Sequence, residues 1–362
     1  MNHYAEYQAR ALSRWPTRTR RVGDVSCNGA RWPRDKRGVR APRSFTVFTA
    51  LVATAAFGAA GDRQQFEQYW YDGGAELSAY KLVQPRYGAP RAGRAVMVWV
   101  TEPFSHSKAV KLDHPEVASD DVIPVLKLNH LRTFQTGIYP YRLMTSVFFP
   151  VIFGAKDPVQ VAPVKVAFSG QEWCGTVYHQ LVKRGDRWRS HWHSYFESEG
   201  EGEKEIPARP RLVFGDDLWF RVRELTAPFA PGTYDFMPSL AAVRLSHTPP
   251  ELGTIDVRRS TSPETIRVPA GSFHVIRWDV EMRWGPNKSQ RQTRTIWTEE
   301  AWPRRIIAWE GDVASFNGNE PQRERAELTG SIRDVYWQHN RPGDEALLKR
   351  LGLAWKGRTE GP

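Results

Sequence analysis

The sequence predicts a mainly β protein, built as a large curved antiparallel sheet or half-barrel with a few short helices. Two observations carry this prediction. Residues 164–200 form two runs rich in aromatic and β-branched side chains around an Arg184-Gly185-Asp186 turn signal. Residues 273–284 alternate between apolar and charged side chains, which is the period of a strand with one buried face.

The chain is predicted to begin with a basic arm and an export signal. Residues 1–43 carry 11 Lys and Arg against 3 Asp and Glu, and the uncharged apolar run that follows, residues 44–60, ends in small residues. We expect a signal peptide at 44–61 and a periplasmic or secreted protein. A retained membrane anchor is the alternative, but the run is short and rich in Ala and Thr. The first 43 residues are either a disordered arm or sequence upstream of the true start.

Residues 62–225 are predicted to form an N-terminal β-rich part. A short helix is expected at the start of 64–81, before the Asp72-Gly73-Gly74 turn. Runs of β-branched and aromatic residues bounded by turn signals predict the strands that follow. These are expected at 77–86, 94–101, 108–112, 122–129 and 134–150.

The hairpin at 164–200 has a register that can be argued from its pattern. A two- or four-residue loop places Lys183 opposite Trp188, Tyr178 opposite His193 and Cys174 opposite Glu197. Apolar side chains then share one face, whereas the histidines and acids share the other. A three-residue loop would mix the two sets, so the even-length loop is favoured. The apolar face comprises Trp173, Val177, Leu181, Trp192 and Phe196.

The second half of the chain is predicted to be an antiparallel meander. Residues 216–223 are expected to form a helix capped by an aspartate. Prolines and glycines accumulate at 226–252, which predicts a connection, and strands resume over 253–340 with charged neighbours on the solvent side. The last part, 341–362, is expected to hold a short helix ended by Gly352 and a tail.

Charge and motifs exclude several familiar classes of protein. The formal charge is +11, but residues 44–362 hold 40 of the 51 basic and 37 of the 40 acidic residues, so the body is nearly neutral. We therefore expect no nucleic acid partner. The phosphate-loop, dinucleotide-fold, zinc-protease and serine-hydrolase motifs do not occur in the sequence. We expect no cofactor, and no membrane span after signal cleavage.

Four segments carry a resemblance to a known family. They are residues 70–77 (WYDGGAEL), 136–150 (TGIYPYRLMTSVFFP), 171–175 (QEWCG) and 193–197 (HSYFE). Together they resemble an uncharacterised family of exported bacterial proteins, some members of which are labelled septum formation inhibitor. The likeness covers roughly residues 66–223, and the family implies export without an established activity. More weakly, the motifs VPAGSF and WTEEAWPRR, starting at 268 and 297, are similar to other exported β-rich domains, for which a curved sheet is expected.

The polar face of the hairpin supplies the candidate catalytic and metal-binding residues. His191 and His193 point the same way on one strand, so they could bind a metal together with Glu197. The alternative, a solvated strand face, is the commoner outcome for such a pattern. Cys174 could act as a thiol nucleophile with His193 as its base, but a carboxylate opposite the thiol disfavours this, and a buried structural cysteine is the favoured alternative. The candidate catalytic residues are Glu172, Cys174, His193 and Glu197.

The aromatic residues indicate binding rather than catalysis. With 15 Trp in the chain, a concave sheet could hold a lipid or glycan against aromatic side chains, although core filling is the favoured explanation for any single Trp. We expect an exported protein that binds an amphiphilic, envelope-derived ligand. The alternatives are a metal- or thiol-dependent hydrolase and an envelope scaffold, and the oligomeric state stays open. The candidate ligand-binding residues are Trp70, Tyr71, Tyr139, Tyr141, Tyr178 and Tyr195.

Overall fold

The computed structural model describes residues 63–117, 120–313 and 322–353, and the predicted basic arm and signal peptide lie outside these residues. The strands of the first half are β1 (Ala75–Arg86), β2 (Ala89–Ser105), β3 (Val110–Lys111), β4 (Val122–Thr136), β5 (Tyr139–Pro150), β6 (Lys165–Glu172), β7 (Gly175–Arg184), β8 (Arg187–Ser194) and β9 (Glu201–Pro207). Those of the second half are β10 (Leu212–Phe214), β11 (Gly232–Met237), β12 (Gly253–Arg259), β13 (Glu264–Val268), β14 (Gly271–Trp284), β15 (Gln290–Glu299), β16 (Ile306–Val313) and β17 (Gln322–Asp334).

The helices of the described residues are short. The α-helices are α2 (Arg63–Trp70), α3 (Leu218–Arg221) and α4 (Leu240–Ser246). The 3₁₀ helices are η1 (Pro115–Val117), η2 (Pro158–Gln160), η3 (Pro286–Lys288), η4 (Tyr336–Gln338) and η5 (Asp344–Leu351). None of the helices in the described part of the chain is long and apolar enough to cross a membrane.

The seventeen strands of the described residues all belong to one sheet. Following the paired strands from edge to edge, the order is β10-β11-β12-β14-β15-β16-β17-β1-β2-β4-β5-β6-β7-β8-β9, with β13 beside β14 and β3 beside β2. Each pair is antiparallel except β10 with β11. Because β1 pairs with β17, the two halves of the chain join into one surface.

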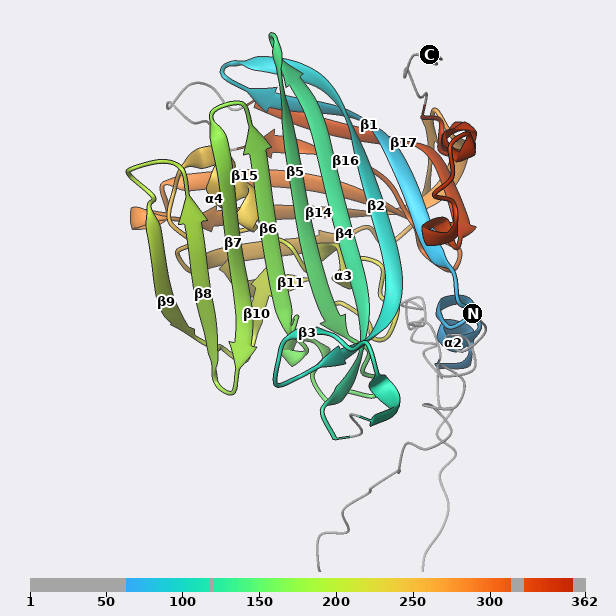
Figure 1. Cartoon of the computed structure of the whole chain (residues 1–362), viewed down its shortest axis with the longest axis horizontal. Coiled ribbons are helices and arrows are strands. Elements are labelled where there is room, and N and C mark those ends of the chain that lie inside the picture. The colour runs from blue at the N-terminus through green and yellow to red at the C-terminus, as the bar shows by residue number, and fades with distance from the viewer. Residues whose placement is uncertain (1–62, 118–119, 314–321, 354–362) are drawn as a thin grey trace, which may run out of the picture.

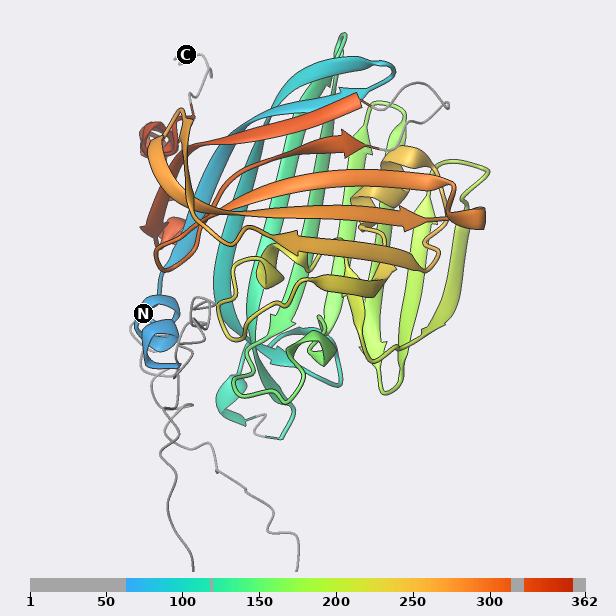
Figure 2. The same cartoon turned by 180° about the vertical axis from the view of Figure 1, so that it is seen from behind.

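The sheet curls over on itself but stays open. β4 to β9 form one wall in Figure 1, β11 to β17 form the other in Figure 2, and β1 and β2 lie where the walls meet. The edge strands β9 and β10 are not paired with each other, although the rings of Trp188 on β8 and Phe214 on β10 are 4.6 Å apart. The predicted fold class, a large curved antiparallel sheet with a few short helices, is confirmed.

One large core fills the space between the two walls. It runs from Phe66 on α2 to Leu328 on β17, so strands on both sides of 226–252 contribute to it. That segment, predicted as a connection, contains β11 and α4. Bulky aromatic side chains fill the interior, since burial of large apolar area is the main stabilising contribution of such residues. The fully buried tryptophans are Trp70, Trp99, Trp188, Trp278, Trp284 and Trp309.

Of the hairpin predicted at 164–200, β7 and β8 form the part next to the Gly185 turn, and the register of that part is confirmed. Lys183 pairs with Trp188 and Tyr178 with His193, across a two-residue loop of Gly185 and Asp186. Val177 and Leu181 are buried on the inner face, as predicted, and the histidines at 191 and 193 lie on the outer face with partial or full exposure. The sequence interpretation missed His179, which shares the inner face and is buried.

The outer end of the hairpin differs from the prediction. Trp173 and Cys174 form the two-residue turn between β6 and β7, because Glu172 pairs with Gly175 there. Pairing of β7 with β8 therefore stops at Val177, and the predicted pairing of Cys174 with Glu197 is wrong. Trp173, predicted to point inward, is 70% exposed, since a turn residue at the sheet rim has no opposing layer.

Two further predictions concern the second half. β14 is the predicted half-buried strand: Trp278, Val280 and Met282 are buried, whereas Arg283 is exposed. The helix predicted at 216–223 exists only as the single turn α3. Asp217 occupies its N-cap position but makes no capping bond, because its carboxylate pairs instead with the Arg221 side chain.

Candidate functional site

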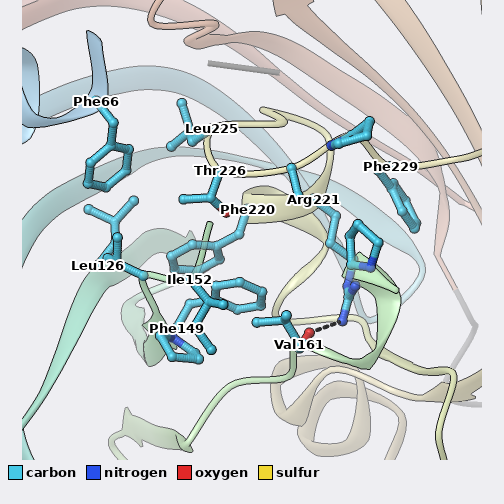
Figure 3. A pocket seen from close by; sticks show the side chains of 15 residues that line it. Phe66, Leu126, Phe149, Ile152, Val161, Phe220, Arg221, Leu225, Thr226 and Phe229 are labelled. Atoms are coloured by element: carbon cyan, nitrogen blue, oxygen red, sulfur yellow. Dashed lines mark hydrogen bonds between the residues drawn. The ribbon is translucent and has the colours of Figure 1, made fainter. Parts of the chain in front are cut away.

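An apolar pocket lies where α2 meets the first part of β4, the last part of β5 and the segment after α3. It encloses about 560 Å³ of space, part of it open to solvent. Figure 3 shows its walls, which come from segments far apart in the sequence. Its lining residues are Phe66, Leu126, Phe149, Pro150, Val151, Ile152, Pro158, Val161, Phe220, Arg221, Leu225, Thr226, Ala227, Pro228 and Phe229.

Aromatic packing fixes the pocket walls. The rings of Phe149 and Phe220 stack with centroids 5.0 Å apart, and Trp99 packs edge-on against Phe220 from the core side at 4.8 Å. Phe66 on α2 packs against Phe153 at 5.4 Å. Such contacts hold each ring in one position. The pocket walls are therefore built from aromatic side chains that pack against one another, not from loops alone.

Arg221 is the one charged side chain among the lining residues, and its charge is already compensated. Its Nε and Nη2 each donate to an oxygen of Asp217 at 2.8 Å, and Nη2 also donates to the backbone oxygen of Val161 at 3.0 Å. Both side chains are almost fully buried. Burial raises the pKa of Asp217, and the guanidinium of Arg221 opposes that rise. The pocket thus presents an apolar surface without a free charge, which suits a hydrocarbon group.

The predicted ligand-binding residues do not line this pocket. Trp70 is fully buried in the core, and Tyr71 packs behind the pocket wall with its ring 5.9 Å from that of Phe66. Tyr139 and Tyr141 lie near the start of β5, whereas the pocket is at its end. Of the remaining two, Tyr178 lies on the outer face of the hairpin, and Tyr195 is exposed in the turn after β8.

The pocket itself was missed by the sequence interpretation. One signal was present, because residues 148–153 read Phe-Phe-Pro-Val-Ile-Phe, an aromatic run whose proline cannot donate a hydrogen bond. The other walls are contributed by α2 and by residues 220–229, and no pattern in the sequence indicates that these three segments meet.

At the other end of β5 and β6, a chain of polar contacts joins α4 to the sheet. Arg244 on α4 donates to Oε1 of Glu172 at 2.6 Å and to Nε2 of His247 at 2.9 Å. Nδ1 of His247 lies 2.6 Å from Oε1 of Glu199, whose other oxygen accepts from the Ser194 hydroxyl at 2.5 Å. Glu172, a predicted catalytic residue, is therefore one half of a buried ion pair, with 4% of its side chain exposed.

The contacts of His247 define its tautomer. Because Arg244 can only donate, Nε2 accepts and Nδ1 carries the proton that it donates to Glu199. Burial opposes ionisation of Glu199, but hydrogen bonds from His247 and Ser194 together hold the pKa of its carboxyl below the ordinary value. Both ring nitrogens are thus engaged, so this histidine is placed to anchor α4 rather than to accept a proton from a substrate.

Tyr141 on β5 borders this polar cluster. Its hydroxyl is 2.6 Å from that of Tyr87, and burial raises its pKa above the ordinary tyrosine value. Tyr139 is only half-buried, with its ring 6.3 Å from that of Trp173. The structure therefore brings Tyr139, Tyr141 and Glu172 to one rim of the sheet, as parts of its packing.

The other predicted catalytic residues do not converge. Cys174 is an exposed, free thiol in the β6–β7 turn, so the favoured expectation of a buried structural cysteine is wrong. Glu197 lies in the exposed turn after β8. His193 faces Glu201 across the β8–β9 pair instead, with Nδ1 and Oε1 3.4 Å apart. The catalytic assignment stays a prediction.

A second group of charges is buried in the core. Arg132 on β4 and Arg294 on β15 approach the carboxylate of Glu324 on β17 to 3.4 and 3.6 Å. Asp216, before α3, accepts a hydrogen bond from the backbone N–H of Leu240 at 2.9 Å. Burial raises the pKa of Asp216 to about 7, although the two arginines and this hydrogen bond lower it. The sequence patterns did not indicate that these residues form a buried charged group.

Comparisons with known proteins give distant structural likenesses. No family model matches the chain, and no curated protein matches it. A β-barrel-like protein of the domain of unknown function DUF1849 from Brucella abortus has 9% identity, with 72% of this chain and 98% of that chain covered and a TM-score of 0.35. A protein described as a candidate exported protein with a YmcC-like fold, from Bacteroides fragilis, has 13% identity, coverage of 71% and 95%, and a TM-score of 0.22. At these scores neither likeness bears on the function of this chain.

Proposed function

We propose that this protein is exported and binds the hydrocarbon part of an amphiphilic envelope molecule in the pocket beside α2. The observation that carries the proposal is the pocket lining, in which aromatic and aliphatic side chains surround a space that is partly open to solvent and the one charged lining side chain, Arg221, is neutralised by Asp217.

The lining also indicates which part of the ligand enters. A carboxylate or phosphate inside the pocket would have to displace Asp217 from Arg221, and both groups are buried. A hydrocarbon chain needs no such exchange, because it replaces water against phenylalanine rings. The charged head of the ligand therefore stays outside. The hydrolase alternative gains no support, since Glu172 is engaged with Arg244.

Binding can be tested with a dansyl-labelled fatty acid and a variant that fills the pocket. Ile152 lines the pocket and is 44% exposed, so Ile152→Trp can occupy the mouth without entering the core. Ile138→Trp is the matched control, since Ile138 is 80% exposed in the β4–β5 turn, away from the pocket. We expect saturable fluorescence with the full chain. The affinity for the labelled fatty acid should fall by at least about tenfold in Ile152→Trp and should stay at the wild-type value in Ile138→Trp. Equal affinity in both variants, or absence of saturable binding, would disprove the proposal.

Export is tested separately with a reporter. The apolar run at 44–60 is the feature that supports it. Fusing alkaline phosphatase, which is active only in an oxidising compartment, behind residues 1–62 in a Gram-negative host should give an active reporter. Deleting 44–60 should abolish that activity. An active reporter after the deletion would show that the run does not direct export.

A further inference from the structure

The outer face of the β8–β9 pair gathers two imidazoles and a carboxylate. His191 and His193 are two residues apart on β8 and so project on the same side of the sheet. Glu201 on β9 lies directly opposite His193, and Glu203 lies opposite His191. β8 is paired on both sides, with β7 and β9, so the backbone holds these side chains in register.

The donor atoms of three of these residues are close enough to share one ion. One ligand atom from each of His191, His193 and Glu201 lies within 4.8 Å of the other two. Nδ1 of His193 and Oε1 of Glu201 are 3.4 Å apart, and the two imidazole centroids are 4.5 Å apart. Ligand atoms of a tetrahedral ion bound at about 2.0–2.1 Å lie about 3.4 Å from one another. The separation between Nδ1 of His193 and Oε1 of Glu201 already has this value.

The remaining separations can close by rotation of side chains. The side chains of His193 and Glu201 are 50% and 69% exposed, so both have room to rotate. Glu203 is not equivalent, because Arg189 binds both of its carboxylate oxygens, at 2.8 and 2.7 Å. Arg189 thereby occupies the carboxylate of Glu203. The geometry selects Glu201 as the third ligand.

We propose that His191, His193 and Glu201 bind one divalent first-row transition-metal ion, such as Zn²⁺. Two imidazoles and one carboxylate suit ions of this class, whereas Mg²⁺ and Ca²⁺ prefer sites built from oxygen. The three ligands lie on one side of the ion, so a fourth position faces solvent. The site lies at the edge of the sheet formed by β8 and β9, on the opposite side from α2, which contributes Phe66 to the pocket lining (Figures 1 and 2). It is therefore independent of the proposed lipid-binding function.

Zinc titration of the tag-free full chain tests the proposal, with isothermal calorimetry in a buffer that does not bind metals. We expect one equivalent of Zn²⁺ to bind the wild-type chain. His191→Ala and His193→Ala should each weaken binding by at least about tenfold, and Glu201→Gln should weaken it in the same direction. Mg²⁺ should not compete. Thermal unfolding without metal should be the same in all variants, because the replaced side chains are on the surface.

Two matched controls distinguish a built site from surface attraction. Glu203→Gln removes an equal charge two residues from Glu201, and His114→Ala removes another histidine that lies beside a carboxylate, 3.2 Å from Glu116. Both variants should keep the wild-type affinity. The proposal is overturned if Glu203→Gln weakens binding as much as Glu201→Gln, if the two strand-histidine variants bind zinc as the wild type does, or if no zinc binds at millimolar concentration.

Discussion

Arg223 and Glu76 form a two-point ion pair inside the core. Nη1 and Nη2 of the arginine donate to the two carboxylate oxygens at 2.8 and 2.9 Å, and at most 1% of either side chain is exposed. The Tyr69 hydroxyl donates to the same carboxylate at 2.9 Å. These contacts tie the end of α2, the start of β1 and the segment after α3 together. Since α2 and that segment also line the pocket, the pair supports the pocket walls.

Removing one partner of this pair should be strongly destabilising. In Glu76→Gln the guanidinium of Arg223 stays buried without a compensating charge, so we expect the free energy of unfolding to fall by about 3–5 kcal/mol. Urea denaturation measures the change. Glu327→Gln is the control, because its partner Arg325 is 57% exposed, and such a pair contributes about 0–1 kcal/mol. Similar losses in both variants would contradict the assigned role.

Asp216 should make the stability depend on pH. The pKa of Asp216 is about 7 in the folded protein against an ordinary value of 3.8, so between these pH values the folded state holds a proton that the unfolded state has lost. The free energy of unfolding therefore falls as pH rises through this window, by up to about 1.4 kcal/mol per pH unit from this group.

The Asp216→Asn variant isolates that contribution. An asparagine oxygen can still accept the hydrogen bond from the N–H of Leu240, and the amide does not titrate in this range. The stability of the wild type relative to Asp216→Asn should decrease from pH 4 to pH 7 and become constant above about pH 8. Chemical denaturation at several pH values gives both curves. Parallel curves would show that Asp216 does not bind a proton in the folded protein at pH 5 or 6.

The fold could be predicted because its signals are local. The Arg184-Gly185-Asp186 turn and the alternation on both sides of it fix the β7–β8 register without knowledge of other strands. Trp173 was placed wrongly because the same alternation was continued past the point where β6 turns into β7. A two-residue turn at Trp173 and Cys174 carries neither glycine nor proline, so the sequence gives little indication of it.

The candidate sites depend on contacts that local patterns do not contain. Glu172 resembles a free polar residue in the sequence, but its partner Arg244 lies 72 residues later on α4. The pocket likewise needs Phe66, Phe149 and Phe220 to meet. His191 and His193 could be identified because they share one strand. The sequence pattern places Glu197 on their face, whereas the structure places Glu201 beside His193, because the position of β9 has no local signal in the sequence.

Two glycines should respond differently to alanine. At Gly311 on β16 an added Cβ would lie 2.0 Å from the backbone oxygen of Thr293, so the strands must move apart. At Gly185 no atom lies within 4 Å, and the only penalty comes from its φ of +57°. We expect losses in the free energy of unfolding of about 3 kcal/mol or more for Gly311→Ala. For Gly185→Ala we expect about 1 kcal/mol. Equal losses, measured by urea denaturation, would refute the close approach of β15 and β16.

Cys174 should react in the folded protein. Its thiol is exposed in the β6–β7 turn, so a maleimide can reach it without any unfolding. Cys27 lies outside the described residues, so the Cys27→Ser variant is used to leave a single thiol. We expect one label per chain by mass spectrometry in native buffer, at a rate that does not change when urea is raised to just below the unfolding midpoint. Adding Cys174→Ser should abolish labelling. Labelling that begins only as the protein unfolds would place the thiol in the interior and would contradict the exposed position of Cys174 in the β6–β7 turn.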